Sequence, residues 1–312
     1  MKKTETAPIR FESLSEASKA TGLPAPLHPL ITLFNGVDKP MEGPVPLPRH
    51  VLSFYKISFR PYLGGILRYG QTHFDYNEGG LFFAAPNQLI GSSDDETSND
   101  AKRCTNQQIS LLIHPDFLLN YPLAEKIRQY TFFSYSVQEA LHLSDKEKEV
   151  ILALFRNLEE ELNNRLDEFS QDVIISQIEL LLSYAHRFYK RQFITRKPVH
   201  HTVLENLEVL LNNYFDGLNS LEKGIPTVQY FADQLNLSPG YLSDLLRSLT
   251  GLNTQQLIHE KLIEKAKEKL STTNLSVSEI AYELGFEHPQ SFSKLFKEKT
   301  RQTPLSFREQ FN

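Results

Sequence analysis

The spacing of hydrophobic residues changes partway along the chain, from strand-like to helix-like. Between residues 51 and 113, short apolar and aromatic runs (VLSFYKISF, LFFAAP, QQISLLI) are separated by turn signals such as NEGG. Such runs predict antiparallel strands that form a small sandwich or barrel. The proline-dense residues 1–45 predict an arm with little regular structure apart from a short helix at residues 13–19.

After His114 the apolar residues recur with helical spacing. Residues 145–163 predict one helix with Ser144 as its N-cap. Residues 169–189 predict a second helix, on which five apolar residues form a seam typical of a coiled coil: Ile174, Ile178, Leu181, Ala185 and Phe188. This seam either packs on its own β-domain or joins two chains, and the pattern favours neither.

A basic stretch follows these helices. Between Glu179 and Glu205 the chain carries five positive charges and no negative one, and Pro198 predicts the end of a helix. We therefore expect a domain over residues 1–190, with a β-barrel at about 46–113 and helices at about 114–190. A basic linker at 191–204 and a helical domain at 205–312 complete the expected organisation.

The C-terminal part contains one plan twice, about fifty residues apart. The segments TVQYFADQLNLSPGYLSDLLRSLTG (227–251) and SVSEIAYELGFEHPQSFSKLFKEKT (276–300) each begin with a capping hydroxyl and then pass through a short helix, a turn and a second helix. Ala232 and Ala281 are small enough to let two short helices cross steeply, which predicts two helix-turn-helix motifs. The continuous helical pattern from Gln255 to Leu270 joins them as one rod.

The repeat resembles the AraC/XylS family of bacterial transcription regulators. The matching residues are Phe231 to Ser238, Tyr241 to Ser243 and Thr250-Gly251 in the first copy, and the run from Ser276 through Thr303, Pro304, Phe307 and Arg308 in the second. The resemblance implies an α+β fold: an N-terminal cupin-like antiparallel β-barrel plus helices, and a C-terminal all-α domain of two helix-turn-helix motifs joined by a linker helix.

The resemblance also implies a function. It predicts a sequence-specific regulator of transcription that binds double-stranded DNA in successive major grooves. The resemblance further implies a homodimer, a contact with RNA polymerase that favours activation while leaving repression open, and a response to a small-molecule effector. The expected DNA-binding residues lie on the polar face of each second helix: Ser243, Asp244 and Arg247 in the first motif, and Gln290, Ser293, Lys294 and Lys297 in the second. The alternative for each is an exposed helix residue that makes no contact.

These side chains have definite partners on DNA. Glutamine pairs with N6 and N7 of adenine and lysine with N7 or O6 of guanine, so we expect Gln290 and Lys294 to read bases. Lys297 is expected on a phosphate. Asp244 is repelled by phosphates, so the first motif is expected to read DNA weakly. Arg301 stands where the family usually has glycine, which predicts either a reshaped turn or a further phosphate contact.

Composition sets limits on other functions. The chain has 312 residues, 40% of them hydrophobic and 23% charged, and a net charge of −5, so it is neither a disordered nor a uniformly basic protein. Its single cysteine, Cys104, excludes an internal disulfide and a multi-cysteine zinc site. No apolar run reaches the length of a membrane-spanning helix, and we expect no membrane association and a cytoplasmic location.

The N-terminal domain offers an effector site. Its many aromatic residues either fill the barrel or line a cavity for a small ligand, and the expected contacts are Tyr55, Arg68, Tyr69 and His73. Isolated histidines and the missing nucleophile motif predict no metal, no other cofactor and no enzymatic activity. Two alternatives stay open: a cupin-type enzyme with an appended DNA-targeting domain, and a dimerisation module with weakened DNA binding.

Overall fold

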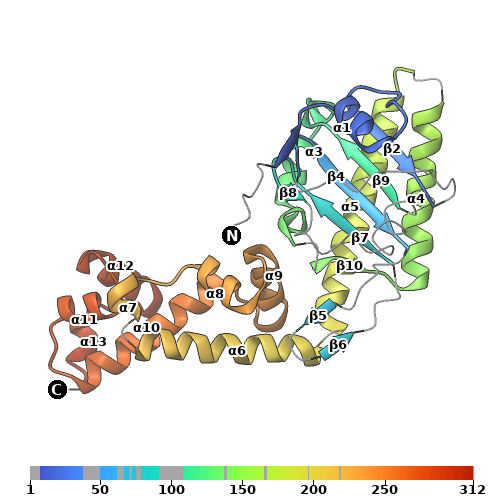
Figure 1. Cartoon of the computed structure of the whole chain (residues 1–312). Coiled ribbons are helices and arrows are strands. Elements are labelled where there is room, and N and C mark those ends of the chain that lie inside the picture. The colour runs from blue at the N-terminus through green and yellow to red at the C-terminus, as the bar shows by residue number, and fades with distance from the viewer. Residues whose placement is uncertain are drawn as a thin grey trace, which may run out of the picture. The chain divides into compact units, whose positions relative to one another are not determined.

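The computed structural model divides into two compact units, Met1–Gln192 and Phe193–Asn312, which are described separately (Figure 1). It describes residues 8–37, 50–61, 67–69, 72–74, 79–90, 108–136, 139–164, 167–195, 197–217 and 219–311. Cys104 lies outside these residues, as do the side chains of Arg68, Tyr69 and His73, for which only the backbone is described.

Two sheets form the framework of the N-terminal unit. The larger has five antiparallel strands in the order β10 (Leu141–His142), β7 (Gly80–Ala84), β4 (Tyr55–Arg60), β9 (Ile109–Ile113) and β2 (Ile31–Asn35). The smaller has three: β1 (Ile9–Phe11), β3 (His50–Leu52) and β8 (Leu89–Ile90). A separate hairpin pairs β5 (Leu67–Tyr69) with β6 (Thr72–Phe74).

One core lies between the two sheets. Phe11 and Leu52 from the smaller sheet cluster with Phe34, Phe82 and Leu112 from the larger one. Helix α1 (Leu14–Thr21) adds Leu14 and Ala17 to the same cluster. The expected α+β fold with a sheet-rich, barrel-like N-terminal part is therefore confirmed, although β1 and β3 pair in parallel rather than antiparallel.

Helices cover the other face of the larger sheet (Figure 1). Helix α4 (Asp145–Asn163) and helix α5 (Ser170–Thr195) follow a short helix α3 (Leu123–Lys126) and three 3-10 turns. On β7 the ring of Phe83 lies 4.6 Å from that of Phe132 and 6.3 Å from that of Tyr189, measured between centroids. Ser144 is the N-cap of α4, as predicted, and forms a capping box with Glu147.

The short helix expected at residues 13–19 is present as α1, but the expectation of little other regular structure was wrong for the described residues 8–37. This region supplies β1, α1 and β2, and β2 pairs with β9 over all five of its residues. Because its apolar run ITLFN is short and lies in a proline-rich region, the local sequence pattern predicted a loop there. Ladder hydrogen bonds and burial of Ile31 and Phe34 outweigh that local signal.

The described residues of the expected linker at 191–204 lie in two helices. Helix α5 continues to Thr195, and α6 (Lys197–Asp216) begins two residues later. Pro198 therefore lies in the first turn of α6 instead of ending a helix. A proline is tolerated there because its missing N–H would have no intrahelical partner.

The apolar seam on α5 is buried within the single chain. Its five residues are between 0% and 7% exposed: Ile174, Ile178, Leu181, Ala185 and Phe188. Of the two interpretations left open by the sequence, the structure supports internal packing. The seam itself is not available to a second chain.

The C-terminal unit is entirely helical, as predicted. After α6 it contains α7 (Asn219–Lys223), α8 (Val228–Leu235), α9 (Pro239–Thr250), α10 (Thr254–Thr272), α11 (Val277–Glu283), α12 (Pro289–Thr300) and α13 (Pro304–Arg308). Phe231, Leu242, Ile258, Ile280 and Phe292 are all fully buried, so every one of the five helices from α8 to α12 contributes to the core.

Candidate nucleic-acid interface

The two repeats fold with the same local geometry. Thr227 caps α8 by accepting a hydrogen bond from the Tyr230 N–H, and Ser276 caps α11 in a capping box with Glu279. Accepting the backbone hydrogen bond in that box lowers the pKa of the Glu279 carboxyl. Each first helix thus begins at a side chain that satisfies otherwise unpaired N–H groups.

The turns also match. Asn236 (φ 54°) and Gly285 (φ 90°) adopt the left-handed conformation after α8 and α11. The next N–H then closes the helix end: Leu237 N to Ala232 O is 2.9 Å, and Phe286 N to Ala281 O is 3.0 Å. Ala232 and Ala281 are fully buried, which confirms the prediction that small residues occupy the crossings.

Gly285 is required for a second reason. A Cβ atom built there would lie 2.5 Å from the carbonyl carbon of Gly224 and 2.8 Å from the Ile225 nitrogen. The loop between α7 and α8 therefore rests directly on the turn of the second motif. Tyr214 of α6 holds this loop through a hydrogen bond to the Gly224 carbonyl at 3.0 Å.

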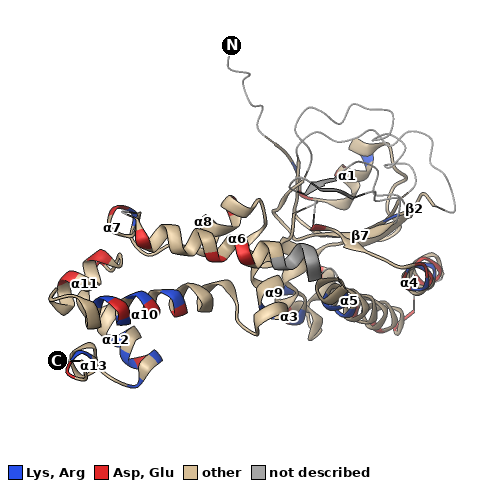
Figure 2. Ribbon diagram, turned by 90° about the horizontal axis from the view of Figure 1, so that it is seen from below, with Lys and Arg blue, Asp and Glu red and all other residues tan. Residues whose placement is uncertain are grey.

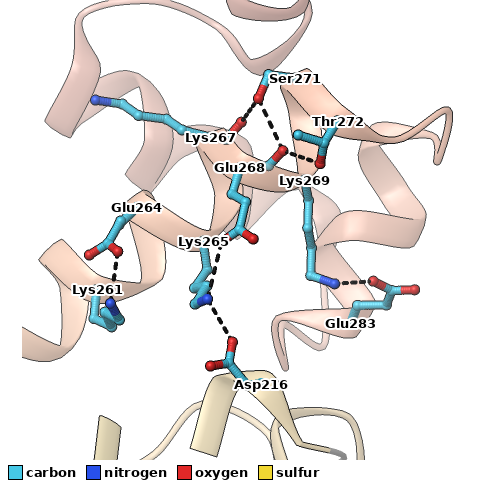
Figure 3. Close-up of polar contacts among 10 residues, drawn as sticks. All are labelled: Asp216, Lys261, Glu264, Lys265, Lys267, Glu268, Lys269, Ser271, Thr272 and Glu283. Carbon is cyan, nitrogen blue, oxygen red and sulfur yellow. Dashed lines mark hydrogen bonds and ion pairs between the residues drawn. The ribbon is translucent and has the colours of Figure 1, made fainter. Parts of the chain in front are cut away.

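Helix α10 connects the motifs and is fixed on both sides by ion pairs (Figure 3). Lys265 lies 2.6 Å from Asp216 of α6, and Lys269 lies 2.7 Å from Glu283 of α11. The hydrogen bond to Asp216 raises the pKa of Lys265 despite partial desolvation. The Ser220 hydroxyl of α7 donates to the Glu283 carbonyl at 2.7 Å. Helices α6 and α7 are thus part of this domain, a role that the repeat pattern does not reveal.

The second recognition helix, α12, has one buried and one basic face. Phe292 and Phe296 are fully buried, whereas Gln290, Lys294 and Lys297 are exposed. Ser293 is half-buried on the border of the polar face. Lys299 and Arg301 are also exposed at the end of the helix, and Glu298 is the one acid of α12. Figure 2 shows Lys and Arg in blue on α12 and Asp and Glu in red on α11.

The first recognition helix, α9, has no net charge on its polar face. Arg247 Nη1 lies 3.3 Å from Asp244 Oδ1, and the two side chains are 56% and 18% exposed. Ser243 is half-buried and shares a hydrogen bond of 3.1 Å with Thr254 at the start of α10. Asp244 thus holds the cation of this helix, and Ser243 helps to join α9 to α10.

Of the four expected effector residues, only Tyr55 has a described side chain, so their grouping stays a prediction. Tyr55 is 7% exposed, and its ring lies 5.2 Å from that of Phe133 on the helix-covered face of the larger sheet. It therefore points away from the interior between the two sheets, and burial raises the pKa of its hydroxyl. The backbones of Arg68 and His73 are paired in the β5–β6 hairpin.

Sequence reasoning missed a polar row on β4. Lys56, Ser58 and Arg60 alternate with Tyr55, Ile57 and Phe59. The alternation in YKISFR was a usable signal, because it places these polar side chains on the second face of a central strand. Among the described residues, no group of three or more histidine, cysteine, aspartate or glutamate residues could hold a metal ion.

Comparison with known proteins agrees with this geometry. A family model described as "Helix-turn-helix domain" matches residues 231–310. The chain is 32% identical over 143 residues to the uncharacterized HTH-type transcriptional regulator YfiF of Bacillus subtilis, covering 46% of this chain and 42% of that protein. It is 31% identical over 140 residues to the raffinose operon transcriptional regulatory protein RafR of Pediococcus pentosaceus, covering 44% of this chain and 48% of that protein.

The C-terminal unit is therefore a helix-turn-helix domain. The match and the similarity to HTH-type transcriptional regulators confirm the resemblance to AraC-type helix-turn-helix domains in this part of the chain. The chain spans less than half the length of either of these relatives. Among solved structures, it is similar to the C-terminal domain of the two-component response regulator yesN from Fusobacterium nucleatum, with 34% identity, a TM-score of 0.29 and coverage of 33% of this chain and 98% of that one. No described helix has the length and apolar composition needed to cross a membrane.

Proposed function

We propose that this protein is a sequence-specific DNA-binding regulator of transcription that anchors itself mainly through its second helix-turn-helix motif. The observation that supports this function best is the exposed basic face of α12, which is built on buried phenylalanines inside an AraC-type domain. Lys294, Lys297, Lys299 and Arg301 outnumber the single acid Glu298 there. On α9 the one cation, Arg247, is instead paired with Asp244.

In this proposal, Gln290, Ser293 and Lys294 read bases, and Lys297 contacts a phosphate. Ser243, Asp244 and Arg247 read the adjacent groove weakly. Each cation on a phosphate releases counterions, so the affinity falls steeply with salt. The alternatives of an enzyme and of a dimerisation module with weakened DNA binding have no comparable arrangement of side chains in support among the described residues.

Direct binding measurements test this function. DNA is selected from a random-sequence pool by the full chain, and its affinity is followed by fluorescence anisotropy across a salt series. Lys297→Ala should weaken all sequences and lower the slope of log K against log salt by about one. Lys223→Ala, which changes an exposed lysine on α7, is the control and should leave the slope unchanged. An equal slope for both variants, or no selected sequence at all, would overturn the proposal.

The regulator acts as a homodimer in this proposal. Beside the buried seam of α5, Val173 and Leu180 are exposed by 40% and 47% and lie seven residues apart on one flank of the helix. Two helices pair through apolar residues at this spacing. Leu180→Lys should shift the full chain from dimer to monomer in analytical ultracentrifugation, whereas Arg187→Ala, at an exposed polar position of α5, should not.

The proposed regulatory output is activation through RNA polymerase, in response to a small-molecule effector in the N-terminal unit. A reporter gene placed downstream of the selected DNA measures the output. Higher expression in the presence of the protein supports activation, and lower expression identifies a repressor.

A further inference from the structure

The inner face of the central strand β4 is polar. Opposite residues of paired antiparallel strands share a face of the sheet. Lys56 lies opposite Ala84 of β7 and Leu112 of β9, and Ser58 lies opposite Phe82 and Ser110. Phe82, Ala84 and Leu112 belong to the core between the two sheets. Lys56, Ser58 and Arg60 therefore face the interior.

Most of this polar row is satisfied. The hydroxyls of Ser58 and Ser110 are 2.8 Å apart and share a hydrogen bond. Arg60 donates from Nε to the Oε1 of Gln108 at 3.3 Å. Lys56 differs from them, because it is half-buried and the described residues give its ammonium neither a hydrogen bond nor an ion pair.

The surroundings of Lys56 favour an anion. Burial, and secondly the charge of Arg60, lower the pKa of Lys56 to about 8. The opposite residues on β7 and β9 are apolar, and neither strand brings a carboxylate against it. From the smaller sheet, His50 shares the face of Leu52 and is the described titratable group on that side. A cation without a partner in apolar surroundings destabilises a fold, and a bound anion removes that cost.

We propose that Lys56 is the anchor of a binding site for a small organic anion, whose charged group pairs with Lys56 and whose apolar body lies against the neighbouring core residues Phe82, Ala84 and Leu112. Arg60 and the Ser58–Ser110 pair add positive potential and hydrogen-bond donors further along the strand. This site rests on the proposed effector-responsive function and gives its ligand a chemical class. It also replaces Tyr55 as the described contact, since Tyr55 faces the helices.

Two fluorescent probes with the same kind of aromatic body test the charge preference. The anionic probe is 8-anilinonaphthalene-1-sulfonate, and the neutral one is N-phenyl-1-naphthylamine. The full chain should bind the anionic probe roughly tenfold more tightly, as expected for one hydrogen-bonded ion pair in a partly buried site. Lys56→Met should abolish this preference without changing the affinity for the neutral probe, and Lys56→Arg should retain it.

The matched control is Lys19→Met, which removes an exposed lysine from α1 and should behave as the unchanged protein. Methionine at position 56 removes a costly charge and should leave the unit folded, as checked by circular dichroism. Equal affinities for the two probes, or equal losses in Lys56→Met and Lys19→Met, would overturn the site. DNA binding is measured separately, so loss of DNA recognition with an intact probe preference rejects the regulator but keeps the site.

Discussion

Arg301 occupies in the second motif the left-handed position that Gly251 occupies in the first. Their φ angles are 64° and 80°, and each donates its N–H to the carbonyl four residues earlier, Lys297 O at 2.9 Å and Arg247 O at 3.0 Å. The preceding threonines also match, since Thr250 and Thr300 each donate to a carbonyl of the last helical turn. The turn is therefore not reshaped by the arginine.

This conformation predicts that Arg301→Gly stabilises the chain. A side chain other than glycine costs about 1 kcal/mol in the left-handed region, and glycine removes that cost. Thermal unfolding of the full chain should show the gain. If the guanidinium contacts a phosphate, the same variant should lower the slope of log K against log salt by about one.

Arg301→Lys separates the two effects. It keeps both the positive charge and the left-handed strain, so its stability and salt slope should stay close to those of the unchanged protein. A loss of stability in Arg301→Gly would contradict the account and would mean that the arginine side chain makes a stabilising contact.

Lys294 should determine preference at one base. Its side chain is exposed on the polar face of α12, one turn before Lys297. Lys294→Ala should cost about 1 to 3 kcal/mol on the selected DNA and relax the preference at a single position. Sequencing of DNA selected by the variant measures this. A uniform loss across all positions would instead assign Lys294 to a phosphate.

Asp244 should limit binding by the first motif. At the position equivalent to Lys294 it carries the opposite charge and holds Arg247 at 3.3 Å. Asp244→Asn should free Arg247 for a phosphate, raise affinity at low salt and steepen the salt slope by about one. Asp233→Asn, at an exposed position of α8, is the control. A lower affinity in Asp244→Asn would show that the carboxylate itself reads a base, for which the N4 amino group of cytosine is the partner.

Gly285→Ala should unfold the second motif. The left-handed φ of 90° and the 2.5 Å approach of a Cβ to Gly224 act together, and we expect a loss of roughly 3 kcal/mol or more. Gly251→Ala is a matched control, because its φ is 80° but nothing lies within 4 Å of a Cβ there. It should cost only about 1 kcal/mol. Chemical denaturation measures both, and equal losses would exclude the steric contribution.

Lys56 should make the stability of the N-terminal unit depend on pH. Its folded pKa of about 8 lies below the ordinary value of 10.5, so the unfolded chain binds more protons between these values. Stability should therefore rise with pH over this window, by roughly 1 kcal/mol per unit. Arg60 keeps its charge throughout, and His50 is present in both the unchanged protein and Lys56→Met. The difference between the unchanged protein and Lys56→Met isolates the effect, and parallel curves would contradict it.

The helix-turn-helix pairs were predictable because their signals are local. Caps such as Ser276, the buried alanines and the turn at Gly285 lie within a few residues of one another and occur twice. The contacts of α6 and α7 with the two motifs were not predictable from the sequence. Asp216 with Lys265 and Ser220 with Glu283 are pairs of residues far apart in the sequence. A net basic face on α12 could be counted from the sequence, but the pairing of Asp244 with Arg247 needed the structure.

In the N-terminal unit, tertiary pairing decided what local patterns could not. The run ITLFN becomes a strand because it pairs with β9 along its whole length, and the described residues of 191–204 belong to α5 and α6 although they include a proline. The seam of α5 gave the right face but not its partner. A row of apolar residues predicts that this face is buried. Only the structure shows that residues of the same chain bury it.

The length of α10 sets the distance and the rotation between the two helix-turn-helix motifs. Its 19 residues extend over about 28 Å, at 1.5 Å per residue, and each added residue would turn the far end by about 100°. A single insertion would therefore swing α12 to a different side of the rod, whereas seven residues would nearly restore its facing but displace it by about 10 Å. The length of α10 therefore sets the distance between the two motifs. A change in the spacing of the DNA segments that they bind would require a change in the length of this helix.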